Sequence, residues 1–279
     1  MNSKRRSFAA YPYIVWSALF IIVPLIMVLF FSFTKDSGSG YGFTFENFQR
    51  MFQKQYAEIY IRSVWLAFIS TAICLVLGYP VAYIISKMDE RKRNIVIMLF
   101  ILPMWMNFLL RTYAWLPILG RNGILNGLLN VFGIAPVQIL YTDAATLLGM
   151  VYNFLPFMIL PIYTVLSKMD QNLINAASDL GATKKQIFTK VIFPLSIPGV
   201  ISGITMVFMP AVSTFVIPKL LGGGKEMLIG NVIEQQFTTM SDKNFGSALA
   251  IVLMIIILIS MAIMSRFDDD NEEGGAHIW

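Results

Sequence analysis

The sequence predicts an all-α membrane protein with six transmembrane helices. Of its 279 residues, 57% are hydrophobic and only 13% are charged, which is about half the charged fraction of an ordinary soluble domain. Six spans of about 22 residues need roughly 132 positions, and this apolar inventory fills them while leaving residues for loops and tails. Apolar runs of that length occur at about 11–34, 61–87, 95–119, 144–167, 195–221 and 246–265.

Two residue types that build many enzyme and metal sites are nearly absent. Cys74 is the single cysteine and lies inside an apolar run, while His277 is the single histidine and lies close to the C-terminus. An internal disulfide, a zinc site or a Ser-His-Asp triad therefore cannot be built from this chain alone. We expect no catalytic residue and no metal site. The net charge of +5 is spread between apolar blocks, which favours membrane topology over nucleic-acid binding as its cause.

The distribution of Lys and Arg predicts that both termini are cytoplasmic. An even number of spans puts both termini on one side, where the chain has twelve basic residues against nine on the other side. The strongest signals are residues 4–6 before the first span and 91–93 in a very short turn, because basic residues in short loops set orientation. A cleavable signal peptide is the alternative for 11–34, but its apolar core is too long and no cleavage site precedes Lys35.

The remaining extramembrane segments are short. Apolar residues recur at near-helical spacing within 120–143 and predict a short helix at the outer interface. The run 222–225, Gly-Gly-Gly-Lys, resembles the end of a phosphate-binding loop but lacks the required glycine and hydroxyl positions, since Lys219 and Glu226 occupy them. It is interpreted as a flexible turn. The acidic run 268–273 is interpreted as a solvated tail.

The central parts of all six spans contain no Asp, Glu or His. Arg111 is the deepest charge, and Arg62 and Lys219 lie near outer span ends, where a long side chain can reach the interface. A carrier driven by an ion gradient needs an ionisable group at membrane depth to bind the proton or sodium ion. The chain is therefore expected to receive energy through a partner, or to be a passive channel.

Nine prolines lie inside or at the edges of the spans. Each removes a backbone hydrogen bond and bends its helix. Two clusters, 102–107 and 152–157, combine such a proline with an asparagine and aromatic side chains. These clusters are candidates for lining a pathway, and the alternative for both is simple packing between helices.

A short cytoplasmic helix is predicted to begin after Asp170 as its N-cap and to end at Gly181. Its apolar stripe follows the i, i+3, i+4, i+7 spacing and comprises Leu173, Ala176, Ala177 and Leu180. Small side chains let a partner approach closely, so this stripe is typical of a docking element. A helix lying on the inner headgroups, which is the alternative, would carry bulkier apolar residues.

A second helix is predicted to follow directly. Thr183 is its N-cap, and Gln186 stands three residues later at the spacing of a capping box. Pro194 is expected to limit this helix before the chain re-enters the membrane.

These residues also resemble a known family. Residues 175–182 read Asn-Ala-Ala-Ser-Asp-Leu-Gly-Ala, with Pro194 downstream, and are similar to the EAA loop of ABC-importer permeases, E-A-A-x-x-x-G-A. Asn175 replaces the usual Glu, which puts that residue's own contacts in question. The resemblance implies a coupling helix, within a loop at 168–193, that sits in a cleft of the ATPase subunit. Its contact residues would be Asn175, Ala176, Ala177, Asp179, Gly181 and Ala182.

The resemblance extends over most of the chain from about residue 60 to 250, where several blocks are similar to spermidine/putrescine permeases. They are Leu77–Tyr83, Leu102–Trp105, Arg111–Trp115, Leu155–Met158, Pro161–Tyr163, Gly222–Gly223, Ile229–Ile233 and Gln236–Phe237. The resemblance implies a type I importer fold, with 1–279 as one transmembrane permease domain in a bacterial inner membrane. It also implies a second homologous permease, an extracytoplasmic substrate-binding protein and nucleotide-binding ATPase subunits that bind the ATP and Mg, so this chain is not itself an enzyme and needs no cofactor.

A polyamine is a multiply charged cation, yet the spans offer no carboxylate to hold one. Aromatic faces can attract ammonium groups by about 0.5–2 kcal/mol each, so high-affinity recognition is expected in the binding protein. A carboxylate in the path would come from the partner permease or from Asp143. The candidate path residues are Trp105, Asn107, Tyr113, Tyr152, Phe157 and Phe215. The alternatives are a permease for another small solute and, disfavoured by the missing carboxylates, an ion-coupled secondary carrier.

Overall fold

The computed structural model describes residues 12–36, 41–224 and 227–276. The basic residues 4–6, Lys225 and His277 lie outside the described residues, and the acidic run 268–273 is described in its backbone only. The interpretations placed on those residues therefore stay predictions.

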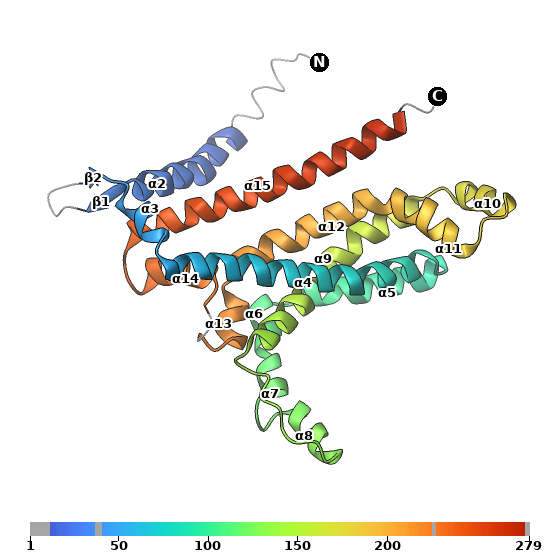
Figure 1. The fold of residues 1–279 in the computed structure, drawn as a ribbon, viewed down its shortest axis with the longest axis horizontal. Helices are drawn as coiled ribbons and strands as arrows, with labels where there is room; N and C mark the ends of the chain where they lie inside the picture. Colours follow the sequence, from blue (N-terminus) through green and yellow to red (C-terminus); the bar gives the residue numbers. More distant parts are fainter. Residues whose placement is uncertain (1–11, 37–40, 225–226, 277–279) are drawn as a thin grey trace. The chain divides into compact units, whose positions relative to one another are not determined.

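Helices dominate the described chain (Figure 1). Within it, five helices are long and apolar enough to cross a membrane: Pro12–Ser32, α4 (Lys54–Ser86), α9 (Asp143–Lys168), Lys184–Ser213 and Lys243–Arg266, the last within α15 (Lys243–Ala276). A sixth candidate is a helix pair, α5 (Glu90–Trp105) with the segment Phe108–Val131, bent by 98°. The predicted all-α membrane fold is confirmed, and the second span begins at Lys54 rather than at residue 61.

Contacts within the chain define two compact units, 1–60 with 232–256 and 61–231 with 257–279. In the first unit, α2 (Val23–Ser32) continues a π-helical turn η1 (Ala18–Ile22), and an antiparallel pair of strands, β1 (Thr34–Asp36) and β2 (Tyr41–Phe43), follows. The unit also holds α3 (Glu46–Met51) and most of α14 (Ile229–Thr238). Its core is centred on Phe245, which is fully buried and meets the ring of Tyr56 edge-on at 4.9 Å.

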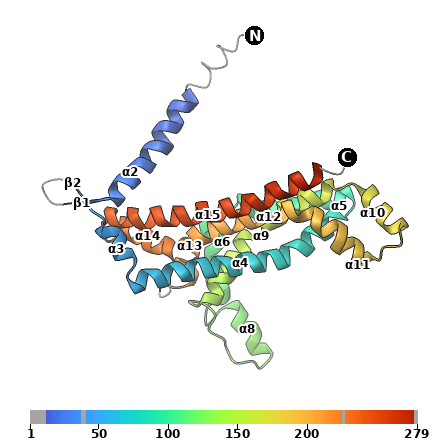
Figure 2. The ribbon, with the colours of Figure 1, turned by 45° about the horizontal axis from the view of Figure 1, so that its top comes forward.

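In the second unit, α9 packs along α12 (Phe193–Ser213), and the two helices run side by side in both views (Figure 2). Two glycines of α12 allow the close approach. A Cβ on Gly203 would lie 2.8 Å from the sulfur of Met158, and one on Gly199 would lie 3.0 Å from the carbonyl oxygen of Pro161. A Cβ contact of 2.8 Å is shorter than real Cβ contacts and one of 3.0 Å is tighter than most of them, so glycine at both positions lets α9 and α12 form a tightly packed pair.

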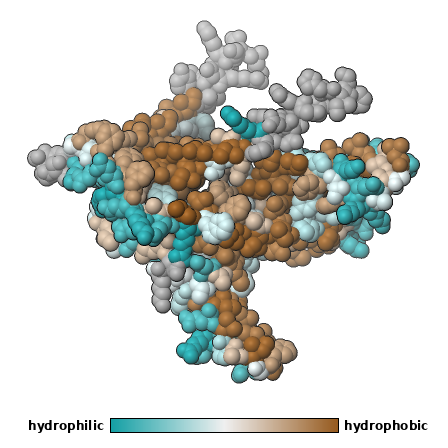
Figure 3. All heavy atoms as spheres, in the orientation of Figure 1, coloured by the Kyte–Doolittle hydropathy of each residue, from teal (hydrophilic) through white to brown (hydrophobic). Residues whose placement is uncertain are grey.

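The other helices of this unit are short: α6 (Phe108–Tyr113), α7 (Trp115–Leu119), α8 (Ile124–Val131), α10 (Gln171–Asp179), α11 (Lys184–Ile187) and α13 (Val216–Leu221). The predicted helix within 120–143 is present as α8, which extends away from the rest of the unit (Figures 1 and 2). Hydrophobic residues cover much of the surface where α4 and α12 lie in the space-filling view, whereas hydrophilic residues gather around α10 and α11 (Figure 3). The long helices thus present apolar surface, as a bilayer requires.

Candidate functional site

The loop that precedes α12 begins with α10, whose two ends are capped as the sequence predicts. A carboxylate oxygen of Asp170 accepts the backbone N–H of Asn172 at 2.9 Å. At the other end Gly181 has φ +80°, its N–H donates to the carbonyl of Ser178, and the next N–H, of Ala182, donates to the carbonyl of Ala177. This pair of hydrogen bonds is a Schellman motif, in which glycine supplies the left-handed residue without strain.

The second helix of the loop starts with the predicted capping box. Gln186 N–H donates to the Thr183 hydroxyl at 3.4 Å, and Thr183 N–H donates to the Gln186 side-chain oxygen at 2.8 Å. The expectation that Pro194 limits this helix is wrong, because Lys184–Ser213 is one continuous helix. A π-helical turn, η2 (Phe188–Ile192), precedes Pro194, and its longer hydrogen-bonding spacing accommodates a residue that has no N–H.

The predicted docking stripe of α10 is largely uncovered in the described structure. Leu180 is 89% exposed and Leu173 is 49% exposed, and Ala176 is exposed while Ala177 is half-buried. Of the other predicted contact residues, Asn175, Asp179 and Gly181 are exposed and Ala182 is half-buried. Apolar side chains left this open are typical of a surface that a partner covers. Leu180 was part of the stripe but was not singled out as a contact residue.

The third span is broken where the sequence analysis expected a kink. α5 ends at Trp105, Met106 is extended with ψ 149°, and α6 begins at Phe108. Asn107 caps the new helix, because its side-chain oxygen accepts the N–H groups of Leu109 at 2.8 Å and Leu110 at 3.3 Å. The amide is therefore used to satisfy backbone donors at the break, which is the requirement for irregular backbone in an apolar medium.

A buried arginine holds this break together. Arg111 is 7% exposed, its Nε donates to the side-chain oxygen of Asn153 in α9 at 2.8 Å, and its Nη1 donates to the carbonyl of Pro103 at 2.9 Å. The guanidinium carbon also lies 5.6 Å from the centre of the Tyr152 ring. An arginine at the centre of a transmembrane helix costs about 2.5–3.5 kcal/mol without such contacts. Arg111 and the 152–157 cluster are both recognisable in the sequence, and the signal for their pairing is that polar groups in neighbouring apolar spans have to find partners.

The fifth predicted span, 195–221, is also interrupted. α12 ends at Ser213 and α13 begins at Val216. At this break the side-chain amide of Asn231 donates to the carbonyl of Phe215 at 2.6 Å. A Cβ on Gly230 would lie 2.6 Å from the carbonyl oxygen of Ser213, so only glycine lets the segment around 230 approach this closely.

Three of the six candidate path residues, Trp105, Asn107 and Phe215, lie at the two breaks. Trp105 ends α5, is 81% exposed, and lines an apolar groove of about 340 Å³ along that helix. Phe215 follows the second break and is 42% exposed, and Tyr113, at the end of α6, is 48% exposed. Tyr152 is 39% exposed and meets Trp115 edge-on at 5.3 Å.

Phe157 is half-buried in α9. Within the part of the chain that the structure describes, no two of these candidate aromatic residues are in ring contact with each other. The carboxylate of Asp143, suggested above as a loop position near the path, is in an ion pair with Arg62.

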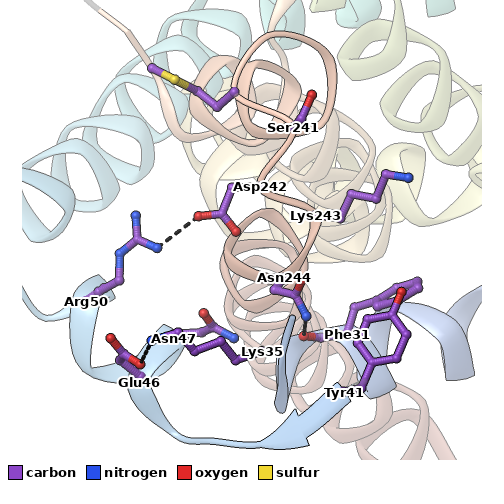
Figure 4. Close-up of a pocket in the computed structure, with 11 residues that line it drawn as sticks. Phe31, Lys35, Tyr41, Glu46, Asn47, Arg50, Ser241, Asp242, Lys243 and Asn244 are labelled. Carbon is purple, nitrogen blue, oxygen red and sulfur yellow. Dashed lines mark hydrogen bonds and ion pairs between the residues drawn. The ribbon is translucent and has the colours of Figure 1, made fainter. Parts of the chain in front are cut away.

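A polar pocket of about 620 Å³ lies in the first unit (Figure 4). The amide of Asn47 donates to the carbonyls of Ser32 and Thr34, and the amide of Asn244 donates to those of Phe31 and Thr34. The carbonyls of Phe31 and Ser32 belong to the last turn of α2, which leaves them without a helical partner, and the carbonyl of Thr34 belongs to β1. The charged lining residues are Lys35, Glu46, Arg50, Asp242 and Lys243.

Two ion pairs cross this pocket, Lys35–Glu46 at 2.7 Å and Arg50–Asp242 at 2.9 Å. The hydrogen bond from Lys35 and its charge lower the pKa of Glu46 below its usual value. The pocket thus fixes the segment between the first span and α4 to the start of α15.

Comparison with known proteins places this architecture in a family. Residues 75–271 match the model of the binding-protein-dependent transport system inner membrane component family, and the chain belongs to that family. It is a multi-pass inner-membrane transport permease and not an enzyme.

Among individual proteins, the chain is 40% identical, over 95% of both chains, to the spermidine/putrescine transport system permease protein PotB of Haemophilus influenzae. It is 39% identical to PotB of Escherichia coli strain K12, over 90% of this chain and 93% of the relative. Both matches include nearly all of the predicted spans.

Solved structures show the same fold at low sequence identity. A bacterial ABC transporter involved in the import of the acidic polysaccharide alginate superposes with a TM-score of 0.78 at 17% identity, covering 94% of this chain and 96% of the other. The MetNI methionine ABC transporter in an inward-facing conformation gives 0.55 at 17% identity, covering 78% and 99%. The chain therefore has the type I ABC importer permease fold.

Proposed function

We propose that this chain is the membrane-spanning permease subunit of an ATP-driven importer of polyamines that works by alternating access. The observation that carries the proposal is the 40% identity to a spermidine/putrescine permease along 95% of both chains. The two interrupted helices support a transport role, because broken helices with satisfied backbone groups are how membrane transporters build sites inside the bilayer.

In this proposal the loop 168–193 couples transport to ATP hydrolysis on a partner chain. Its exposed stripe, ending in Leu180, would be covered by a cleft of a nucleotide-binding subunit that binds ATP and Mg. The hydrogen-bonded caps at Asp170, Gly181 and Thr183 fix the conformation of the loop. A displacement of the loop by the ATPase subunit would therefore move the membrane helices rather than deform the loop. The direct continuation of the loop into α9 and α12 supports this role.

A second homologous permease and an extracytoplasmic binding protein complete the proposed importer, with both termini of this chain in the cytoplasm of a bacterial cell. Trp105, Asn107, Tyr113, Tyr152, Phe157 and Phe215 are the proposed path residues. The scattered placement of their rings fits a pathway that the second permease completes and that passes a cation without trapping it. Tight recognition would then belong to the binding protein.

The experiment is reconstitution of the four kinds of subunit in liposomes, with radiolabelled spermidine and its binding protein outside and ATP supplied to the ATPase side. The expected result is saturable uptake with ATP and none with a non-hydrolysable analogue. Uptake of another small solute in place of spermidine would keep the importer and refute the polyamine assignment. Uptake driven by an imposed ion gradient without ATP would refute both.

A further inference from the structure

One contact in the second unit joins the coupling side of the chain to the broken third span. Arg111 donates to Asn153 of α9 at 2.8 Å and to the carbonyl of Pro103, two residues before the end of α5, at 2.9 Å. We propose that Arg111 is a positioning residue that transmits displacement of α9 to the α5–α6 break, where Trp105 and Asn107 lie. This inference rests on the proposed function, since it needs an ATPase that moves the coupling loop.

The helix between the loop and this contact is braced. α9 runs unbroken from Asn153 to Lys168, and α10 begins three residues later, at Gln171. Pro156 and Pro161 lie within this stretch and would weaken it alone. However, α12 packs closely against it, with its glycines against Met158 and Pro161. Displacement of α10 would therefore carry α9 with it instead of bending it.

The contact is built for one defined geometry. Asn153 is fully buried, and its own amide donates to the carbonyl of Gly149 at 2.8 Å, which fixes its oxygen toward Arg111. A guanidinium is a planar fork that can hold two acceptors at once, whereas the lysine ammonium is a compact point charge on a flexible stem. The Pro103 carbonyl also accepts the backbone N–H of Met106, at 3.2 Å. Through its two hydrogen bonds, Arg111 therefore connects α9 to the end of α5.

A purely structural role of Arg111 predicts a different experimental result from a role in transmitting the displacement of α9. If Arg111 only stabilises the fold, its variants lose assembly, ATP hydrolysis and uptake together. If Arg111 transmits motion, variants that assemble still hydrolyse ATP when the loaded binding protein docks. In these variants α9 moves, but the α5–α6 break no longer moves with it. The amount of substrate taken up per ATP then falls. Because Arg111 and Asn153 form one contact, the double variant should lose no more uptake per ATP than either single variant.

The test compares Arg111→Lys, Asn153→Leu and the double variant in the complete reconstituted importer, with spermidine as the transported probe. The matched control is Asn126→Leu, which removes an equally buried amide that donates to the carbonyls of Gly120, Arg121 and Val137. We expect ATP hydrolysis to persist and uptake per ATP to fall by about 5-fold or more in the first three, as typical coupling between sites requires. The control should keep the wild-type ratio. Equal uptake per ATP in wild type and Arg111→Lys would overturn the inference.

A second measurement reports directly on the accessibility of the α5–α6 break. Met106 is 60% exposed beside the break and Cys74 is buried, so Met106→Cys gives one accessible thiol. Its rate of labelling should change between nucleotide-free and ATP-trapped importer when Arg111 is present, and should stop changing in Arg111→Lys. The same nucleotide-dependent change in both backgrounds would overturn the inference. A wild-type importer that moves no spermidine would instead refute the proposed function, and this labelling comparison would still test Arg111.

Discussion

Replacing Gly181 with valine tests the coupling loop at the point where its two helices meet. Gly181 has φ +80°, and no atom lies within 4 Å of the position that a Cβ would take. A larger side chain at this position would therefore meet no neighbouring atom, and steric crowding is not the cause of the expected effect. The cost is backbone strain, which is about 1–2 kcal/mol for an ordinary L-residue in the left-handed region. Strain of this size lowers the population of the native turn by a factor of about 5–30.

Two further variants separate strain in the loop from general damage. Gly181→Asn adds a side chain to the same open space, but asparagine adopts the left-handed region several times more readily than most residues. Gly133 ends α8 with φ +70°, open space around its Cβ position and the same two hydrogen bonds. Gly133→Val therefore imposes the same strain outside the coupling loop.

The assay is ATP-dependent uptake by the reconstituted importer, with assembly of the ATPase subunit measured in parallel. We expect Gly181→Val to lose uptake by about 5- to 30-fold, following the turn population, while Gly181→Asn and Gly133→Val stay close to wild type. Full ATP-dependent uptake in an assembled Gly181→Val importer would refute the coupling assignment. An equal loss in Gly133→Val would show that strain anywhere has this effect.

The remaining predictions concern the path and the pocket of the first unit. Trp105→Ala should lower spermidine uptake while the affinity of the binding protein for spermidine, measured by calorimetry, is unchanged; unchanged uptake would remove Trp105 from the path. Arg50→Ala should lower the free energy of unfolding by about 1–2 kcal/mol, because it removes a partly exposed ion pair with Asp242 and a cation–π contact with the ring of Phe245 at 4.1 Å; an unchanged free energy of unfolding would contradict both contributions. Lys35 lowers the pKa of Glu46, so the stability that this pair adds is present at neutral pH and is lost as pH falls through that lowered pKa. The difference in melting temperature between wild type and Glu46→Gln should therefore shrink from pH 7 to strongly acidic pH, and a constant difference would contradict this cause.

The helical fold and the shape of the loop 168–193 could be predicted from the sequence because both depend on local rules. Long apolar runs have to be helices in a bilayer, and the caps at Asp170 and Thr183 and the glycine at 181 are decided by residues within a few positions. The expectation for Pro194 is wrong because the π-helical turn η2 before it accommodates a residue without an N–H. The capping and proline rules do not predict such a turn from local spacing.

The two helix breaks show where sequence reasoning stops. A kink near Pro103 could be predicted, but the 98° bend there is accompanied by a hydrogen bond between Arg111 and Asn153, which are far apart in the chain. Likewise, Asn231 reaches a carbonyl sixteen residues away in the chain, and no periodicity signals it. A signal was present, since buried amides and an arginine in apolar helices need partners, yet the choice of partner depends on the tertiary structure.

The most direct test of the account is competition uptake of radiolabelled spermidine in cells that lack their own polyamine importers. This chain is expressed there with its ATPase, second permease and binding protein. The account predicts saturable uptake that putrescine competes, that survives an uncoupler and that stops when ATP is depleted. Uptake that collapses with the uncoupler while ATP is maintained would contradict ATP-driven import, and an assembled complex that takes up no spermidine would contradict the polyamine assignment.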